Sequence, residues 1–154
     1  MQTRRELFKN AAALAALMAG AGLLPGQARA DASFNRAAFD AKTMDQMLKA
    51  LGLGKPVESN LVTLVAPDIA ENGAVVPVEA SSTAPGLKRL MFLVEKNPAI
   101  LAACFEMSEA IEPYIKTRVK MGQTCNVYAV AVTADNKILF AQKEVKVTLG
   151  GCGG

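Results

Sequence analysis

The sequence contains no histidine and no tryptophan among its 154 residues. Histidine is the commonest general base and metal ligand in proteins, and its charge most often changes near neutral pH. Three cysteines are present, and no two of them form a C-x-x-C pair, which disfavours zinc binding and thioredoxin-like redox chemistry. We therefore expect no metal site, no cofactor and no active site that works alone.

A long apolar run is also lacking. The most apolar stretch, residues 11–26, spans about 16 residues and includes Gly20, Gly22 and Pro25. A membrane-spanning helix needs roughly 20 apolar residues. The basic segment MQTRRELFKN precedes this stretch and an A-x-A site ending at Ala30 follows it, which is the arrangement of an export signal. We expect cleavage after Ala30 and no membrane anchor.

Arg4 and Arg5 indicate the export route. They lie in the sequence TRRELFK, which resembles the twin-arginine motif apart from the exchanged order of Leu7 and Phe8. We therefore expect residues 1–30 to be a twin-arginine-type signal that is removed, and the mature protein to lie in the periplasm.

The mature chain carries no excess charge. Removing the signal takes away four of the 17 basic residues and one of the 14 acidic residues, which leaves 13 of each. Binding to nucleic acid or to an anionic membrane surface depends on an excess of positive charge. Neither is therefore expected as a partner.

Two kinds of pattern follow the signal. Residues 34–52 are predicted to form one amphipathic helix, because Met44, Met47, Leu48 and Leu51 recur at helical spacing. Residues 31–59 then hold this helix and a linker. Residues 60–149 show short β-type runs between turn residues, which predicts an all-β, Ig-like antiparallel sandwich. The predicted strands are residues 60–65, 75–81, 89–94, 100–107, 114–120, 127–132, 137–141 and 144–148.

Two of these strands are apolar on both faces. In RLMFLV, Leu90, Phe92 and Val94 face one side of the sheet, and the two residues between them face the other. The run VYAVAV, residues 127–132, has the same property. An antiparallel strand with one face in water would instead alternate between apolar and polar residues. We expect the second face to be covered by the N-terminal helix, by a partner protein, or by both at different strands.

The chain ends in a cysteine flanked by glycines, at Gly150, Gly151, Cys152, Gly153 and Gly154. Glycine frees the backbone and adds no bulk, so these residues are predicted to form a flexible arm. Five extended residues reach roughly 17 Å at ~3.4 Å each. No histidine is available to activate the thiol, so we expect Cys152 to be a covalent attachment site that reacts in another protein's active site. An incidental unstructured end or an interchain disulfide remains the alternative.

Cys104 and Cys125 lie in or beside predicted strands. An oxidising compartment favours disulfides, and a bond between these two would leave Cys152 free. Two buried thiols, or a link to a partner, are equally open from the sequence.

The export signal, the order of helix and strands, and the end of the chain together resemble the SoxY family of sulfur-oxidation carriers. The most specific part is VKVTLGGCGG, with TRVK and VYAVAV upstream in the expected order. The resemblance implies a non-catalytic periplasmic carrier that forms a heterodimer with a smaller Ig-like subunit, SoxZ, and holds thiosulfate-derived sulfur on Cys152. Neither Cys104 nor Cys125 belongs to the family signature.

The resemblance also implies three partner enzymes. A haem-containing enzyme would join thiosulfate to Cys152, a hydrolase would release sulfate, and a sulfane dehydrogenase would oxidise the sulfur that remains.

Two other functions fit part of the sequence. A ubiquitin-like sulfur carrier would use the carboxylate of Gly154 after Gly153, but such a protein has neither an export signal nor so many strands. An Ig-like structural or adhesion subunit would have the fold, and its terminal cysteine would then be incidental.

Overall fold

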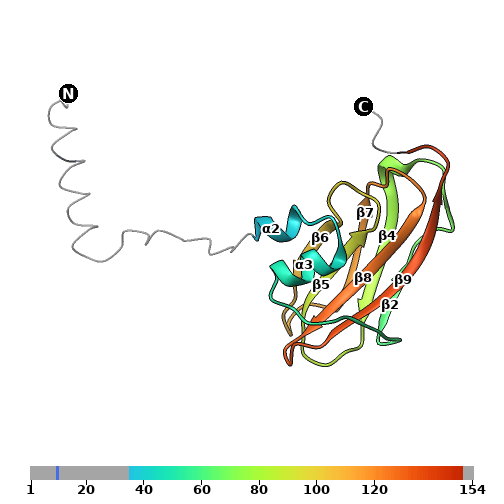
Figure 1. Cartoon of the computed structure of the whole chain (residues 1–154). Helices are drawn as coiled ribbons and strands as arrows, with labels where there is room; N and C mark the ends of the chain where they lie inside the picture. Colours follow the sequence, from blue (N-terminus) through green and yellow to red (C-terminus); the bar gives the residue numbers. More distant parts are fainter. Residues whose placement is uncertain (1–9, 11–34, 151–154) are drawn as a thin grey trace, which may run out of the picture. The chain divides into compact units, whose positions relative to one another are not determined.

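The computed structural model describes residues 10 and 35–150 (Figure 1). The predicted signal, residues 1–30, lies outside the described residues except for Asn10, and so do the last four residues, which include Cys152. From Asn35 onward the chain forms one compact unit. Its elements are α2 (Arg36–Phe39), α3 (Met44–Ala50), β1 (Val57–Glu58), β2 (Val62–Val65), β3 (Ile69–Ala70), the 3-10 turn η1 (Gly73–Val75), β4 (Val76–Ser82), β5 (Leu87–Val94), β6 (Leu101–Glu106), β7 (Tyr114–Val119), β8 (Cys125–Thr133) and β9 (Ile138–Val147).

The strands form two sheets, which confirms the predicted all-β, Ig-like sandwich. The larger sheet has the order β1-β9-β8-β5-β6, and β3 also pairs with β9; the smaller sheet has the order β2-β4-β7. Two details differ from the prediction. The runs at 137–141 and 144–148 are one continuous strand, β9. The two-residue strands β1 and β3 pair with β9 in parallel, and they are too short to show a periodicity in the sequence.

The predicted two-faced strands are confirmed by the packing of β5 and β8. Leu90, Phe92 and Val94 belong to the core between the two sheets, whereas Met91 and Leu93 belong to a second core on the outer face. Helices α2 and α3 cover that outer face (Figure 1). The helices contribute the buried side chains Ala38, Met47 and Leu48, and the turn between them contributes Ala41. The outer face of these strands is thus buried within the chain itself and gives no argument for a partner protein.

The prediction of one helix over residues 34–52 is wrong, because the chain forms two short helices with a break at residues 40–43. The Thr43 hydroxyl accepts a hydrogen bond from the Gln46 N–H at 3.2 Å and caps α3. The Gln46 amide oxygen in turn accepts from the Lys42 N–H at 3.0 Å. This arrangement is close to a capping box, so the T-x-x-Q spacing was a usable signal for a new helix start.

The break also serves the packing of the helices on the sheet. It frees the Ala41 carbonyl to accept a hydrogen bond from the Ile100 N–H at 2.9 Å, just before β6. The Asn35 side chain donates to the Ala50 carbonyl at 2.7 Å and ties the start of α2 to the end of α3. A single straight helix could make neither contact.

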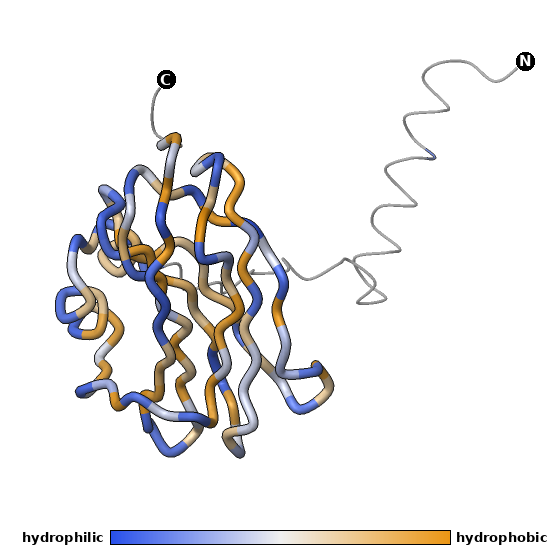
Figure 2. The backbone as a smooth tube through the Cα atoms, turned by 90° about the vertical axis from the view of Figure 1, so that its right-hand side faces the viewer, coloured by the Kyte–Doolittle hydropathy of each residue, from blue (hydrophilic) through white to orange (hydrophobic). Residues whose placement is uncertain are grey.

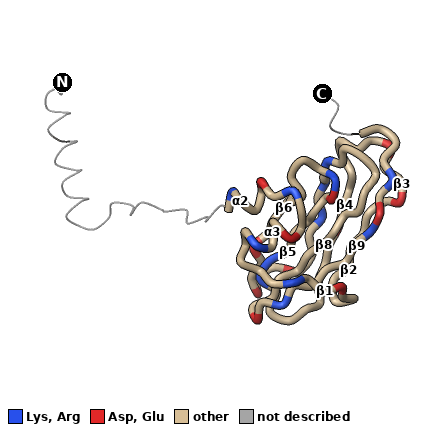
Figure 3. The backbone as a smooth tube through the Cα atoms, in the orientation of Figure 1, with Lys and Arg blue, Asp and Glu red and all other residues tan. Residues whose placement is uncertain are grey.

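Charged residues are distributed over the surface with both signs. In the described part of the chain, Lys and Arg lie interspersed with Asp and Glu (Figure 3). Among these residues no helix is long and apolar enough to cross a membrane.

Candidate functional site

The candidate site is the root of the C-terminal arm, which we define as residues 146–150. They comprise the last two residues of β9 and the three residues after it, and they run beside residues 68–73. Strand β3 pairs in parallel with β9, so that Ile69 lies opposite Lys146. The Lys146 N–H donates to the Asp68 carbonyl at 2.9 Å, and the Thr148 N–H donates to the Ala70 carbonyl at 3.1 Å. The chain end is therefore held by a distant segment through its backbone.

Further contacts hold the last described residues. The Gly73 N–H donates to the Leu149 carbonyl at 2.7 Å. The Thr148 hydroxyl donates to the Glu71 carbonyl at 3.0 Å, and the Val147 N–H donates to the Thr124 hydroxyl at 2.9 Å. The arm root is thus fixed from two sides, by residues 68–73 and by the start of β8.

Gly150 is the last described residue and lies close to the backbone of Gly122, whereas its assignment to a flexible arm stays a prediction. A Cβ atom on Gly150 would overlap the carbonyl oxygen of Gly122 and lie 3.4 Å from its carbonyl carbon. The Gly122 loop is itself held by Asn97, which accepts from the Gly122 N–H at 3.2 Å and donates to the Lys120 carbonyl at 2.7 Å. Glycine is therefore required at position 150 by a close approach of two backbones.

Covalent geometry bounds the position of the terminal thiol. Cys152 lies outside the described residues, two positions beyond Gly150. Two residues span at most ~7 Å, so its Cα atom lies within that distance of the Gly150 Cα atom. An arm that starts after Leu149 would instead put the Cys152 Cα atom up to ~10 Å from the last held residue, at ~3.4 Å per residue.

A shallow polar pocket lies beside the arm root, and Gly150 and Cys125 both line it. Its charged residues are Glu95, Glu144 and Lys96. Two carboxylates against one ammonium group disfavour an anion in this pocket. Burial also raises the pKa of the Cys125 thiol, so the reactive thiolate form is disfavoured there.

The structure does not bring Cys104 and Cys125 together. Both are free thiols. Cys104 lies on β6 opposite Met91 and packs against the outer core, whereas Cys125 lies on β8 in the core between the sheets. The disulfide that the sequence left open between them is therefore not formed, because the two side chains lie on opposite faces of one sheet. Burial raises the pKa of Cys104 as well.

Sequence reasoning missed the residues that hold the arm root. The ENG and MGQ segments, which contain Gly73 and Gly122, have the composition of ordinary turns. Their contacts to the chain end are backbone contacts, which leave no mark in the side-chain pattern. Within residues 10 and 35–150, no group of three or more Cys, Asp or Glu side chains is placed to hold a metal ion.

The fold and this site define a β-sandwich protein whose last strand is held by backbone bonds from a distant segment, shortly before the C-terminal cysteine in the sequence. The chain belongs to the SoxY family: the family model described as "Sulfur oxidation protein SoxY" matches residues 48–152 and so extends through Cys152.

Comparison with solved structures agrees with this assignment. The sulfur carrier protein SoxY from Chlorobium limicola f. thiosulfatophilum is 31% identical, with a TM-score of 0.61 over 68% of this chain and 94% of that chain. A superoxide reductase (neelaredoxin) from Ignicoccus hospitalis is 18% identical, with a TM-score of 0.48 over 57% of this chain and 80% of that chain. A search of curated protein sequences finds no match.

Proposed function

We propose that this chain holds thiosulfate-derived sulfur on Cys152 and presents it to partner enzymes in the periplasm. Membership of the SoxY family gives the chain a sulfur-carrier role in sulfur oxidation. The observation that carries the assignment to Cys152 is the geometry of the arm root. The strand end is held by backbone bonds, and Gly151 and Cys152 follow it in the sequence, which supports attachment at a thiol within a short reach of the arm root.

The two other thiols are poor candidates for the attachment site. Cys125 is buried and Cys104 is half-buried, and burial raises the pKa of both. A sulfur cargo on either thiol would have to fit into a packed core. This contrast favours Cys152 as the residue that carries the cargo.

The proposed chemistry begins with the joining of thiosulfate to the thiol. The Cys152 S–H bond is broken, a bond forms between its sulfur and the outer sulfur of thiosulfate, one proton is released, and two electrons pass to the haem enzyme. Water then cleaves the terminal sulfonate as sulfate in the hydrolase and leaves a persulfide on Cys152. Oxidation of that outer sulfur to a sulfonate by a sulfane dehydrogenase, with water as the oxygen source, and a second hydrolysis return the thiol.

Activation of a thiol needs a neighbouring base, cation or helix N-terminus, and the chain contains no histidine to act as the base. The proposed role is therefore non-catalytic, and each bond change takes place in an enzyme that receives the arm. A heterodimer with a SoxZ-like subunit completes the proposed carrier.

Mass spectrometry of C-terminal peptides tests this proposal. After incubation with thiosulfate and the Sox enzymes, we expect the added mass on Cys152 and none on Gly154, where a ubiquitin-like carrier would hold it. Cys152→Ser should take up no sulfur, whereas Cys104→Ala is the matched control and should be loaded like the wild type. Full thiosulfate-dependent turnover by Cys152→Ser would refute the carrier role of this residue.

The export proposal has its own test. Replacing Arg4 and Arg5 by Lys should leave unprocessed precursor inside the cell, because the twin-arginine route requires the arginine pair. The wild-type chain should be recovered from the periplasm with Asp31 as its first residue. Normal processing of the double variant would contradict a twin-arginine signal.

A further inference from the structure

Three large apolar side chains are exposed around the arm root. Ile69 on β3 is 58% exposed, Val75 at the end of η1 is 53% exposed, and Leu149 is 66% exposed. Figure 2 shows hydrophobic residues where the described chain ends. We call Ile69, Val75 and Leu149 the apolar collar.

The collar residues come from three segments that hydrogen bonds join to one another. Ile69 lies opposite Lys146 in the pairing of β3 with β9. The Gly73 N–H, two residues before Val75, donates to the carbonyl of Leu149 itself. The same contacts that hold the arm root therefore also hold the two segments that carry Ile69 and Val75 against it.

The short stretch of chain between Gly150 and Cys152 determines how closely an enzyme that receives the thiol must approach the collar. The Cα atom of Cys152 lies at most ~7 Å from that of Gly150. An enzyme that closes its active site around the sulfur of Cys152 must therefore bring the rim of that site to within about one side-chain length of the arm root. Contact with the collar follows from this short reach.

We propose that the apolar collar is the docking surface for the enzymes that process sulfur on Cys152, whose active-site entrances would carry a complementary apolar rim. This proposal rests on the proposed function. A carrier subunit bound permanently over the collar would occupy the space that the arm needs. The surface for a stable partner subunit is accordingly a different one, and the collar binds enzymes in turn.

Apolar contacts at such a rim contribute to binding and leave the chemistry unchanged. The double variant Ile69→Ser, Leu149→Ser should raise the KM of the sulfate-releasing hydrolase for the thiosulfate-loaded heterodimer roughly tenfold, with kcat unchanged. Both side chains are exposed, so the fold should tolerate the change. The rate of Cys152 alkylation by iodoacetamide should equal that of the wild type, because the thiol is untouched.

Val57→Ser is the matched control. Val57 is 61% exposed on β1, which pairs with the opposite end of β9 at Leu139. It lies about seven residues of strand away from the collar, roughly 23 Å. This variant should have the KM of the wild type. The conservative variant Ile69→Val, Leu149→Met should also retain it, because it keeps an apolar surface.

Three results would overturn the proposal. The first is an unchanged KM for the double serine variant when its Cys152 accepts sulfur normally, and the second is an equal rise in KM for Val57→Ser. The third is loss of the heterodimer in the double variant on size-exclusion chromatography, which would make the collar the subunit interface. None of these affects the proposed function, which fails only if sulfur is absent from Cys152 of the wild type.

Discussion

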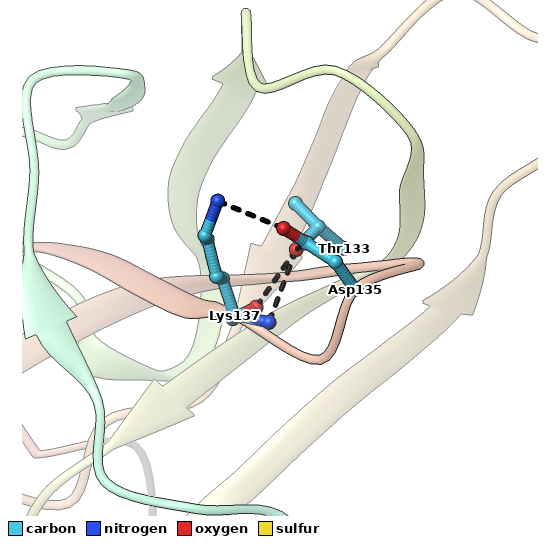
Figure 4. Close-up of polar contacts among 3 residues, drawn as sticks. All are labelled: Thr133, Asp135 and Lys137. Carbon is cyan, nitrogen blue, oxygen red and sulfur yellow. Dashed lines mark hydrogen bonds and ion pairs between the residues drawn. The ribbon is translucent and has the colours of Figure 1, made fainter.

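The two ends of β9 are held in different ways. At its start, the β8–β9 hairpin is closed by backbone bonds, such as the Thr133 N–H to the Lys137 carbonyl at 3.1 Å, and by a local group of side chains (Figure 4). The Thr133 hydroxyl donates to the Asp135 carboxylate at 2.5 Å and accepts from the Lys137 N–H at 3.2 Å, and the Lys137 ammonium lies 2.8 Å from Asp135. At its end, backbone bonds from residues 68–73 hold the arm root. The hairpin should therefore tolerate changes that the arm root does not.

This difference suits the roles of the two ends. The hairpin only reverses the chain, and its exposed ion pair adds little to the backbone bonds there. In the proposed function, the arm root holds the start of the arm in place while an enzyme receives Cys152. Bonds from the distant residues 68–73 and the close approach of Gly150 to Gly122 serve this purpose.

The largest effect, on both stability and sulfate release, is expected for a substitution at Gly150. Gly150→Ala adds one Cβ atom that overlaps the Gly122 carbonyl, so the arm root must move, at a cost of about 1–3 kcal/mol in the free energy of unfolding. Thermal unfolding and sulfate release from the loaded carrier measure the two consequences. Gly54→Ala is the control, because its Cβ would lie at an ordinary 3.9 Å from the Ile138 side chain. Wild-type stability and turnover in Gly150→Ala would show that the root does not need this contact.

A smaller effect is expected at Asn136, in the hairpin. Its φ of 59° lies in the left-handed region, which asparagine and glycine tolerate better than other residues. Asn136→Ala should lower the free energy of unfolding by about 1 kcal/mol and leave sulfur transfer unchanged. Asn136→Gly should be close to the wild type in chemical denaturation. A loss of transfer in Asn136→Ala would mean that the two ends of β9 are coupled.

The smallest effect is expected at Asp135 and depends on pH. Hydrogen bonds from Lys137 and Thr133 lower the pKa of the Asp135 carboxyl from 3.8 to about 2. Because the folded pKa is depressed, the resulting stability is present above the unfolded value of 3.8 and is lost as the pH falls toward 2.

Asp135→Asn should lack this contribution. We expect its unfolding midpoint to fall less steeply than that of the wild type between about pH 4 and pH 2. Other carboxyls with lowered pKa values, Asp68 and Glu79, titrate equally in both proteins and cancel in the comparison. Identical acid profiles would show that the hairpin ion pair contributes nothing measurable.

Strand periodicity predicted the sandwich well, and it failed where the elements are short. The faces of Leu90, Phe92 and Met91 followed from alternation alone, because a pleated strand places successive side chains on opposite sides. Strand β3 has only two residues and therefore no measurable period. The helix break at Thr43 was legible as a capping sequence, but the apolar spacing across it also fitted one continuous helix.

For the candidate site as well, the sequence predicted some features and the structure alone revealed others. The terminal cysteine, its flanking glycines and the absence of histidine are properties of the sequence, and they were sufficient to indicate a thiol that reacts in another protein's active site. The close approach of Gly150 to Gly122 was not accessible from the sequence, because a contact between two glycine backbones leaves no mark in the residue pattern.

The sequence by itself determined the fold class, the two apolar faces of β5 and β8, and the chemistry available to the chain, because these depend on residue type and local spacing. Only the tertiary structure decided which segments hold the chain end. The Thr148 N–H donates to the carbonyl of Ala70, which is distant in the sequence. Every residue but proline carries the same backbone donor and acceptor, so hydrogen bonds between backbones select partners by position in space and leave no residue pattern to read.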